Sequence, residues 1–370
     1  MSALHYKRRL EPLLAAAGVR LDGSEPWDIE VHQPGFYRRV LAHGSLGLGE
    51  SYMEGWWDAE DLDGLLCRLL KADLDEQDHT WDMKLTVLRA RLLNLQRQSR
   101  AFEVGRRHYD LDDSLYKAML GRRLVYSCGY WKEAETLDAA QEAKLELVFR
   151  KLGLKPGMRV LDIGCGWGEG LKLAAERYGV TGVGITVSEK QAEYARGLCQ
   201  GLPIEIKMMD YRELHESYDR IFSIGMFEHV GEKNYRLYME LARRCLKEDG
   251  LFLLHCIGSN ISTHITDPWI LKYIFPNGML PSIQQIGEAI ERLFVMEDWH
   301  NFGAHYDRTL MAWRRNVEQH WQELKGRFDP MFYRMWRYYL SASAGSFRAR
   351  KSQLWQIILS PHGVPGGYSR

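Results

Sequence analysis

The chain has 370 residues, a length that suggests about two to three domain-sized units. Hydrophobic residues make up 45% and charged residues 26%, which predicts a buried core and argues against wholesale disorder. Basic and acidic residues balance at 49 each. A protein dedicated to nucleic acid would be more basic, so we expect no nucleic-acid partner.

No stretch approaches the roughly 20 apolar residues that span a bilayer, and no apolar segment follows the charged start Met1–Arg9. None of the six cysteines forms a C-x-x-C pair, which argues against a zinc knuckle, a thioredoxin-type site or another metal centre built on such pairs. A disulfide scaffold is not expected at this size. We therefore expect a cytoplasmic protein with reduced thiols.

The first 80 residues mix extended and helical patterns. Trp27–His32 alternates like a strand, and Phe36–Leu41 is typical of the start of a helix. The segment Gly47–Trp57 is rich in glycine and aromatic residues, and taken alone it favours a tight turn packed on a small core. We expect a small N-terminal α+β domain over residues 1–82.

A basic helical linker is expected over residues 83–108. Its leucines recur at helical spacing and share one face: Leu85, Leu88, Leu92 and Leu95. Its basic residues lie around and after them: Lys84, Arg89, Arg91, Arg97, Arg100, Arg106 and Arg107. Such a helix can lie on anionic lipid, or its leucines can dock two domains, and the two roles are compatible.

We expect residues 109–370 to form a second domain, because short apolar runs alternate there with helical stretches. The runs are Val160–Ile163, Val183–Ile185, Ile204–Asp210, Ile221–Ile224, Leu251–His255, Phe294–Trp299 and Leu354–Leu359. The pattern predicts an α/β fold, a Rossmann-like seven-stranded sheet that is mainly parallel and has helices on both faces.

The strongest local motif is Asp162-x-Gly164-x-Gly166-x-Gly168, which directly follows the first of these apolar runs. Glycines at such a turn let the backbone approach a ligand at a helix N-terminus. The spacing differs from the dinucleotide fingerprint G-x-G-x-x-G. It resembles motif I of the class I methyltransferases that use S-adenosylmethionine.

Polar residues follow the next strands. Thr186 and Gln191 stand where many nucleotide-binding folds place an acid for the ribose hydroxyls, although a plain strand end also fits. Asp210 can accept a hydrogen bond from an adenine amine, or it can cap a helix. Glu228 and His255 follow the fourth and fifth strands, where ligands of open α/β sheets bind.

At these residues the chain resembles the cyclopropane-fatty-acyl-phospholipid synthase family over nearly its whole length. The resemblance rests on Glu50–Asp58, His108–Asp110, Tyr126–Trp131, Val160–Gly168, Gly225–Gly231, Leu254–Gly258, Asp267–Gly278, Met296–Gly303, Leu310–Trp313 and Phe347–Arg350. It implies transfer of a methylene group from S-adenosylmethionine to the cis double bond of a phospholipid acyl chain.

The resemblance also implies roles for individual residues. Those that would contact the cofactor are Tyr126, Ser127, Asp162, Gly164, Gly166, Thr186, Gln191, Asp210 and Tyr211. Those that match the family's bicarbonate site are Cys128, Glu228, His255, Ile257 and Tyr306. Bicarbonate would deprotonate the carbocation intermediate, although the sequence alone would allow Glu228 itself to be the base. The resemblance further implies a homodimer, a catalytic domain over residues 109–370, and an N-terminal domain over residues 1–82 that assists lipid binding. Because the substrate lies in a membrane and no apolar stretch is long enough to span one, we expect reversible association with anionic phospholipids at the inner face of the membrane.

Two positions depart from the family pattern. Ser343 stands where many relatives have cysteine, and Glu169 follows Gly168 where relatives often have glycine. Three alternatives remain at this point. One is a methyl-branching or small-molecule methyltransferase on the same fold, and another is a non-catalytic lipid-binding protein with a vestigial pocket. The third, a nucleic-acid methyltransferase, would want a more basic chain.

Overall fold

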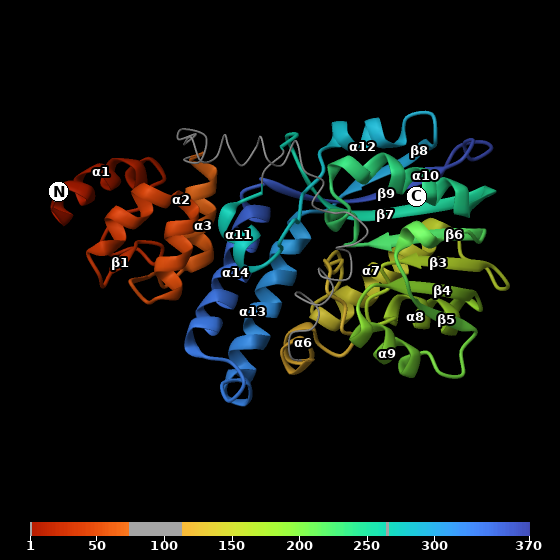
Figure 1. Ribbon diagram of the computed structural model, residues 1–370, viewed down its shortest axis with the longest axis horizontal. Coiled ribbons are helices and arrows are strands. Elements are labelled where there is room, and N and C mark those ends of the chain that lie inside the picture. Colours follow the sequence, from red (N-terminus) through yellow and green to blue (C-terminus); the bar gives the residue numbers. More distant parts are fainter. Residues whose placement is uncertain (1, 74–112, 264–265) are drawn as a thin grey trace. The chain divides into compact units, whose positions relative to one another are not determined.

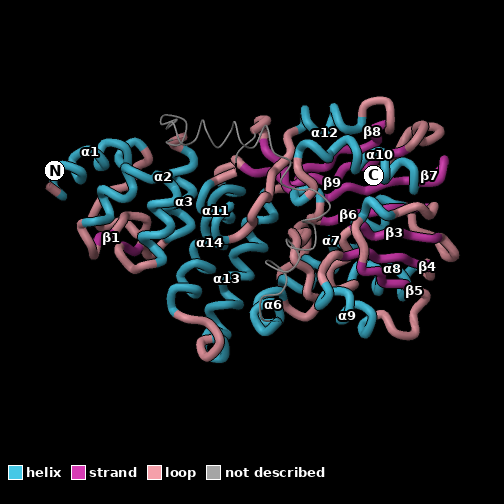
Figure 2. The backbone as a smooth tube through the Cα atoms, in the orientation of Figure 1, coloured by secondary structure: helices cyan, strands magenta, loops and turns pink. Residues whose placement is uncertain are grey.

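The computed structural model describes residues 2–73, 113–263 and 266–370. The described chain forms two compact units. One consists of residues 2–73, 266–276 and 306–352, and the other of residues 113–263, 277–305 and 353–370. The first unit is mostly helical, whereas the second contains the large sheet (Figure 2). The basic segment 83–108, and with it the expected boundaries at 82 and 108, lies outside the described residues.

The helical unit combines N-terminal elements with helices from near the C-terminus (Figure 1). Its elements are α1 (Ala3–Ala16), β1 (Glu30–Val31), α2 (Gly35–Met53), β2 (Trp57–Asp58), α3 (Leu62–Lys71), α11 (Pro268–Tyr273), α13 (Ala304–Leu324) and α14 (Pro330–Arg348). The strand expected over Trp27–His32 is confined to β1, which pairs antiparallel with β2.

The tight turn favoured for Gly47–Trp57 is wrong in extent, because α2 continues to Met53 and only the following residues turn. The helix is kinked at Gly44, whose φ of 53° suits glycine. Gly49 allows close packing, since a Cβ there would lie 2.4 Å from the ring of Trp269. The glycines of this segment therefore serve helix packing, which composition alone does not reveal.

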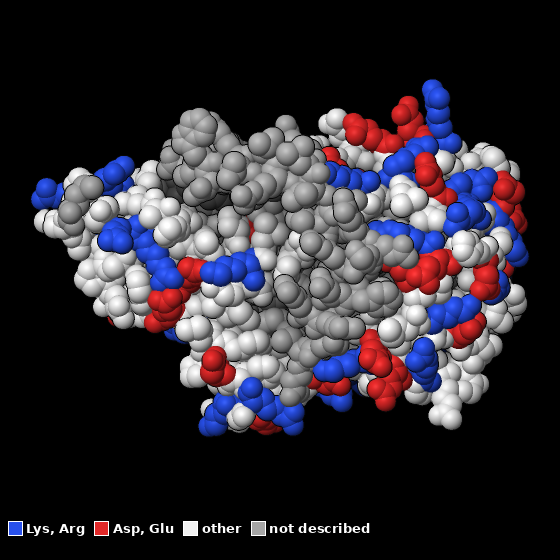
Figure 3. Space-filling model, viewed as in Figure 1, with Lys and Arg blue, Asp and Glu red and all other residues white. Residues whose placement is uncertain are grey.

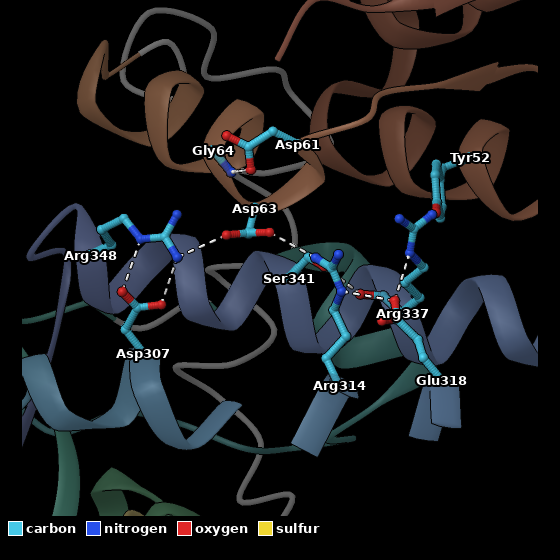
Figure 4. Close-up of polar contacts among 10 residues, drawn as sticks. All are labelled: Tyr52, Asp61, Asp63, Gly64, Asp307, Arg314, Glu318, Arg337, Ser341 and Arg348. Carbon is cyan, nitrogen blue, oxygen red and sulfur yellow. Dashed lines mark hydrogen bonds and ion pairs between the residues drawn. The ribbon is translucent and has the colours of Figure 1, made fainter. Parts of the chain in front are cut away.

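Buried ion pairs connect α3 to α13 and α14 (Figure 4). Asp63 of α3 is 6% exposed, and its two carboxylate oxygens bind Arg314 Nη1 at 2.7 Å and Arg348 Nη2 at 2.8 Å. Arg348 also forms a two-bond pair with Asp307. Because the buried Asp63 carboxylate binds arginines from two different helices through charge-assisted hydrogen bonds, it is expected to be important for the cohesion of this unit.

The second unit is built around a seven-stranded sheet of order β5-β4-β3-β6-β7-β9-β8. Its strands are β3 (Arg159–Ile163), β4 (Thr181–Thr186), β5 (Ile204–Met208), β6 (Tyr218–Ile224), β7 (Leu246–Ser259), β8 (Val295–Asn301) and β9 (Ser352–Ser360). Its helices are α6 (Asp113–Leu120), α7 (Leu137–Leu152), α8 (Glu169–Tyr178), α9 (Glu189–Leu198), η2 (Tyr211–Glu213), η3 (Phe227–His229), η4 (Glu232–Asn234), α10 (Tyr235–Cys245) and α12 (Ile283–Ile290).

The pairs β5–β4, β4–β3, β3–β6 and β6–β7 are parallel, while β8 and β9 pair antiparallel. Successive side chains of the strands point to opposite faces of the sheet and contribute to two hydrophobic cores. One core packs under α10 and α12, and the other under α7, α8 and α9, so helices cover both faces (Figure 1). The expected Rossmann-like α/β sheet is confirmed. Acidic and basic side chains are interspersed on the face shown in Figure 3, in keeping with the balanced charge.

Candidate active site

A single cavity in the sheet unit gathers every residue predicted to contact the cofactor. Its lining includes Tyr126, Ser127, Asp162, Gly164, Gly166, Thr186, Gln191, Asp210 and Tyr211. These residues come from the loop before α7, from motif I, and from the segments that follow β4 and β5. Because those strands are parallel, their carboxyl ends meet at one edge of the sheet. Sequence positions up to 85 apart are thereby brought to one site.

The motif I glycines are required by backbone geometry. Gly164, Gly166 and Gly168 have φ values of 90°, 53° and 88°, a region that other residues adopt only at a cost. A Cβ on Gly164 would lie 2.9 Å from the side chain of Met226. The loop ends at α8, whose first residue is Glu169, so a helix N-terminus adjoins the cavity.

Thr186 and Gln191, at the end of β4 and just beyond it, bind each other, and a contact with ribose hydroxyls stays a prediction. Thr186 Oγ1 donates to Gln191 Oε1 at 2.8 Å, and it accepts from the backbone N–H of Ser188 at 3.2 Å. Ser188 in turn caps α9 by accepting from the N–H of Gln191. The amide oxygen of Gln191 is therefore occupied by Thr186. The NH₂ group of Gln191 remains as a donor to a ligand hydroxyl.

Asp210 has the capping role that the sequence left open. Its carboxylate accepts from the backbone N–H of Arg212 at 2.9 Å and pairs with the Arg212 guanidinium at 2.9 Å. It also lines the cavity, so a contact with adenine stays a prediction. Burial raises the pKa of neighbouring Tyr211 to about 12, and its ring packs edge-on against Tyr238.

The loop before α7 is held against that helix by backbone-directed hydrogen bonds. Tyr130 N–H donates to Ala140 O at 2.8 Å, and Gln141 Nε2 donates to Ser127 O at 2.7 Å. A Cβ on Gly129 would lie 2.9 Å from Ala140 Cβ, so the loop approaches the helix closely. This packing places Tyr126 and Ser127 on the cavity and buries Cys128 fully.

Glu228 occupies η3, directly after β6. One carboxylate oxygen, Oε1, accepts from the N–H of Ile257 at 2.7 Å, while Oε2 is buried without a hydrogen-bond partner among the described residues. Burial raises the pKa of Glu228 from 4.5 to about 7. The structure thus brings Glu228 and Ile257 together, with the Ile257 N–H used to orient the carboxylate.

His255 lies on β7, level with the end of β6. Gln356 Nε2 donates to His255 Nδ1 at 3.2 Å, so the neutral ring carries its proton on Nε2. Burial, together with the charges of Lys144 and Lys151, lowers the pKa of His255 well below 6.5. In the part of the chain that the structure describes, His255 Nε2 is buried and has no partner. His255 therefore presents an N–H donor.

Cys128 and Tyr306 complete the residues matched to a bicarbonate site. Cys128 Sγ donates to Gly129 O at 3.2 Å. Tyr306 belongs to the helical unit, where its ring packs on Phe347 at 4.6 Å between centroids and edge-on against Trp313. Its role stays a prediction.

Sequence reasoning missed Lys144 and Gln356, and it placed Glu169 only as a departure. Lys144 lines the cavity from α7, and the Glu169 carboxylate there pairs with Arg123. Lys144 falls at helical spacing with Gln141, Val148 and Lys151, so its face mixes polar and apolar residues and gave no clear signal. No local pattern pointed to Gln356.

Comparison with known proteins identifies the family. Residues 96–357 match the family described as mycolic acid cyclopropane synthetase. The Cyclopropane-fatty-acyl-phospholipid synthase of Escherichia coli strain K12 is 51% identical over 364 residues, which cover 98% of this chain and 95% of that protein. The chain belongs to the cyclopropane-fatty-acyl-phospholipid synthase family. It is an enzyme of the methyltransferase class.

Other members of this family agree in fold. Cyclopropane mycolic acid synthase 3 of Mycobacterium tuberculosis is 35% identical over 272 residues, covering 68% of this chain and 94% of that protein. The structure of mycolic acid cyclopropane synthase CmaA1 complexed with SAH and CTAB superposes with a TM-score of 0.66 and 32% identity, covering 70% of this chain and 97% of that one. Among the described residues, no helix is long and apolar enough to cross a membrane.

Proposed function

We propose that this enzyme transfers a methylene group from S-adenosylmethionine to the cis double bond of unsaturated phospholipid acyl chains, and that bound bicarbonate acts as the base. One observation supports the cofactor most strongly: every residue predicted to contact it lines one cavity at the end of a parallel sheet. The similarity to the E. coli synthase over nearly the full chain supports the substrate class.

The buried polar atoms of the site fit bicarbonate. Glu228 Oε2 and His255 Nε2 are both buried without partners among the described residues. An acceptor and a donor left in this way cost free energy unless a ligand satisfies them. Bicarbonate carries an O–H that can donate to a carboxylate and oxygens that can accept from an imidazole N–H. The residues present therefore fit this group.

When bound, S-adenosylmethionine supplies an electrophilic methyl group and bicarbonate supplies a base. The chain aligns the reacting groups and excludes water, because an alkene is a weak nucleophile and a carbocation reacts readily with water. Glu228 accepts and orients a proton at Oε2, and the backbone of Ile257 holds that carboxylate in place. His255 donates from Nε2, and Gln356 fixes the tautomer that makes this donation possible.

The substrate lies in a membrane, so we also propose that the enzyme binds the cytoplasmic membrane surface reversibly and acts there as a homodimer. The basic segment 83–108 is the candidate for contact with anionic headgroups, since each basic residue near such a surface contributes about 1 kcal/mol. Binding to anionic vesicles should then weaken as salt increases. Salt-independent binding would contradict this assignment and indicate apolar insertion instead.

The bicarbonate site is tested by Glu228→Gln and Tyr306→Phe. Both variants are expected to lose turnover by about 100-fold or more while retaining their affinity for S-adenosylmethionine. A direct readout is the line broadening of ¹³C-bicarbonate in NMR, which should occur with the wild type and disappear with Glu228→Gln. Glu240→Gln, at an exposed residue of α10, is the control and should retain both properties. Unchanged turnover and binding in Glu228→Gln would refute the site.

A further inference from the structure

Two ionisable side chains of opposite type line the cavity and are buried there. Lys144 is 0% exposed and Asp162 is 4% exposed. Lys144 Nζ lies 2.9 Å from the neutral hydroxyl of Ser127. Asp162 Oδ1 has no hydrogen-bond partner among the residues that the structure describes. Among the described residues no ion pair within 4 Å links the two groups, although each charge acts on the other at longer range. Neither group therefore has a charged hydrogen-bond partner there.

Burial acts against the charged form of both groups. It lowers the pKa of Lys144 to about 7 and raises the pKa of Asp162 well above 3.8. A ligand that places a carboxylate at Lys144 and an ammonium at Asp162 would satisfy both groups with charge-assisted hydrogen bonds. An α-amino acid group is such a ligand, because it carries both charges on one carbon.

We propose that Lys144 binds the α-carboxylate of S-adenosylmethionine while Asp162 receives its α-ammonium group. The inference rests on the proposed use of this cofactor, and it assigns Lys144 as a residue that selects for the carboxylate. Lys144 has three N–H donors, of which one is directed to Ser127 Oγ. Ser127 and Tyr126 both line the cavity, so the same lysine also holds the loop that borders it.

The charge of Lys144 also acts on Cys128 and His255, two residues assigned to the bicarbonate site. Its place in the cavity lining is the observation that favours the cofactor role. Lys144 belongs to the cavity lining, whereas Glu228 and His255, as the structure describes them, do not. The neighbours of Lys144 in the lining include the motif I residues Asp162 and Gly164, which border the helix N-terminus.

A chemical double-mutant cycle tests the proposal. Dissociation constants are measured by calorimetry for S-adenosylmethionine and for decarboxylated S-adenosylmethionine, which keeps the sulfonium and the amine but lacks the carboxylate. The wild type should bind the decarboxylated compound about 10- to 100-fold more weakly, the range expected for one hydrogen bond between charged groups. In Lys144→Met the ratio of the two dissociation constants, decarboxylated compound over S-adenosylmethionine, should fall towards one.

Lys151→Met is the matched control. Lys151 is also buried on α7, two turns further along, but it pairs with Asp298 at 3.4 Å and is not part of the cavity lining. Its loss should leave the ratio unchanged. The proposal is overturned if Lys144→Met keeps the wild-type ratio.

The wild type alone also decides the matter if Lys144→Met does not fold. Equal binding of the two compounds by the wild type would refute a carboxylate contact, and so would an undiminished ratio in the polar variant Lys144→Gln. Failure of the wild type to bind S-adenosylmethionine at all would instead refute the proposed function. The two failures are therefore distinguishable.

Discussion

The ionisation of Glu228 gives a prediction whose size follows from the structure. Burial raises the pKa of Glu228 from 4.5 to about 7, so the folded protein holds this proton more tightly than the unfolded chain does. The contribution of Glu228 to stability is therefore fully present below pH 4.5 and is lost as the pH rises through about 7. At about 1.36 kcal/mol per pH unit, ionised Glu228 costs the folded state about 3 kcal/mol above pH 7.

Glu228→Gln removes this cost and preserves the local shape. The amide oxygen can still accept from the Ile257 N–H, and no charge remains at the atom without a partner. The free energy of unfolding of the variant relative to the wild type should therefore grow by about 2 to 3 kcal/mol between pH 5 and pH 8. At pH 8 the variant should be more stable than the wild type, because it lacks the buried, ionised carboxylate. It should also lack turnover, because the same carboxylate serves catalysis.

Urea unfolding at pH 5 and pH 8, in buffer free of carbon dioxide and cofactor, measures this difference. The control is Glu240→Gln. The wild-type Glu240 carboxylate is 49% exposed and pairs with Arg236. The free energy of unfolding of this variant relative to the wild type should therefore change by at most about 0.5 kcal/mol between pH 5 and pH 8. If the free energies of unfolding of the wild type and of Glu228→Gln change by the same amount between pH 5 and pH 8, Glu228 ionises as freely as an exposed carboxyl. That result would refute the prediction.

Three further predictions concern stability, the cofactor and catalysis. Asp63→Ala should lower the free energy of unfolding by about 2 to 3 kcal/mol, because it removes two charge-assisted hydrogen bonds from Arg314 and Arg348, which keep Glu318 and Asp307 as their other partners. Asp61→Ala, which removes the N-cap of the same helix, should cost about 1 kcal/mol. Equal losses in urea unfolding would contradict this. Gly164→Ala should weaken S-adenosylmethionine binding at least about tenfold, since the added Cβ would collide with Met226 and φ is 90° at this position. Wild-type affinity in calorimetry would refute the role of the motif. Gln356→Leu should reduce kcat about 10- to 100-fold without changing cofactor affinity, because His255 loses the hydrogen bond at Nδ1. In ¹⁵N NMR, His255 should then no longer show a single tautomer. An unchanged tautomer would contradict the positioning role of Gln356.

The sheet could be predicted from sequence because its signals are local. Apolar runs of strand length, separated by helical stretches, predicted seven strands in a mainly parallel sheet, and motif I marked the first crossover. The order of the strands in the sheet was not predicted. The cavity followed from topology, since parallel strands end at a common edge. Thr186, Gln191 and Asp210 were found for that reason.

The remaining features depend on contacts between distant segments. Gln356 meets His255 across 101 residues of sequence, and nothing in its own surroundings on β9 indicates that contact. Lys144 resembles an ordinary helical lysine until tertiary packing buries it. The requirement for glycine at position 49 comes from Trp269, which is more than 200 residues away. Such features require the fold, because local propensity does not contain them.

The central claim is that this enzyme forms a cyclopropane ring on a phospholipid acyl chain. The most direct test incubates the protein with vesicles of cis-unsaturated anionic phospholipid and S-adenosylmethionine, and follows the lipid by mass spectrometry and proton NMR. We predict a gain of one CH₂ per chain, loss of the olefinic proton signals and new cyclopropane signals. A gain of CH₂ with the olefinic signals retained, or no gain at all, would contradict the account.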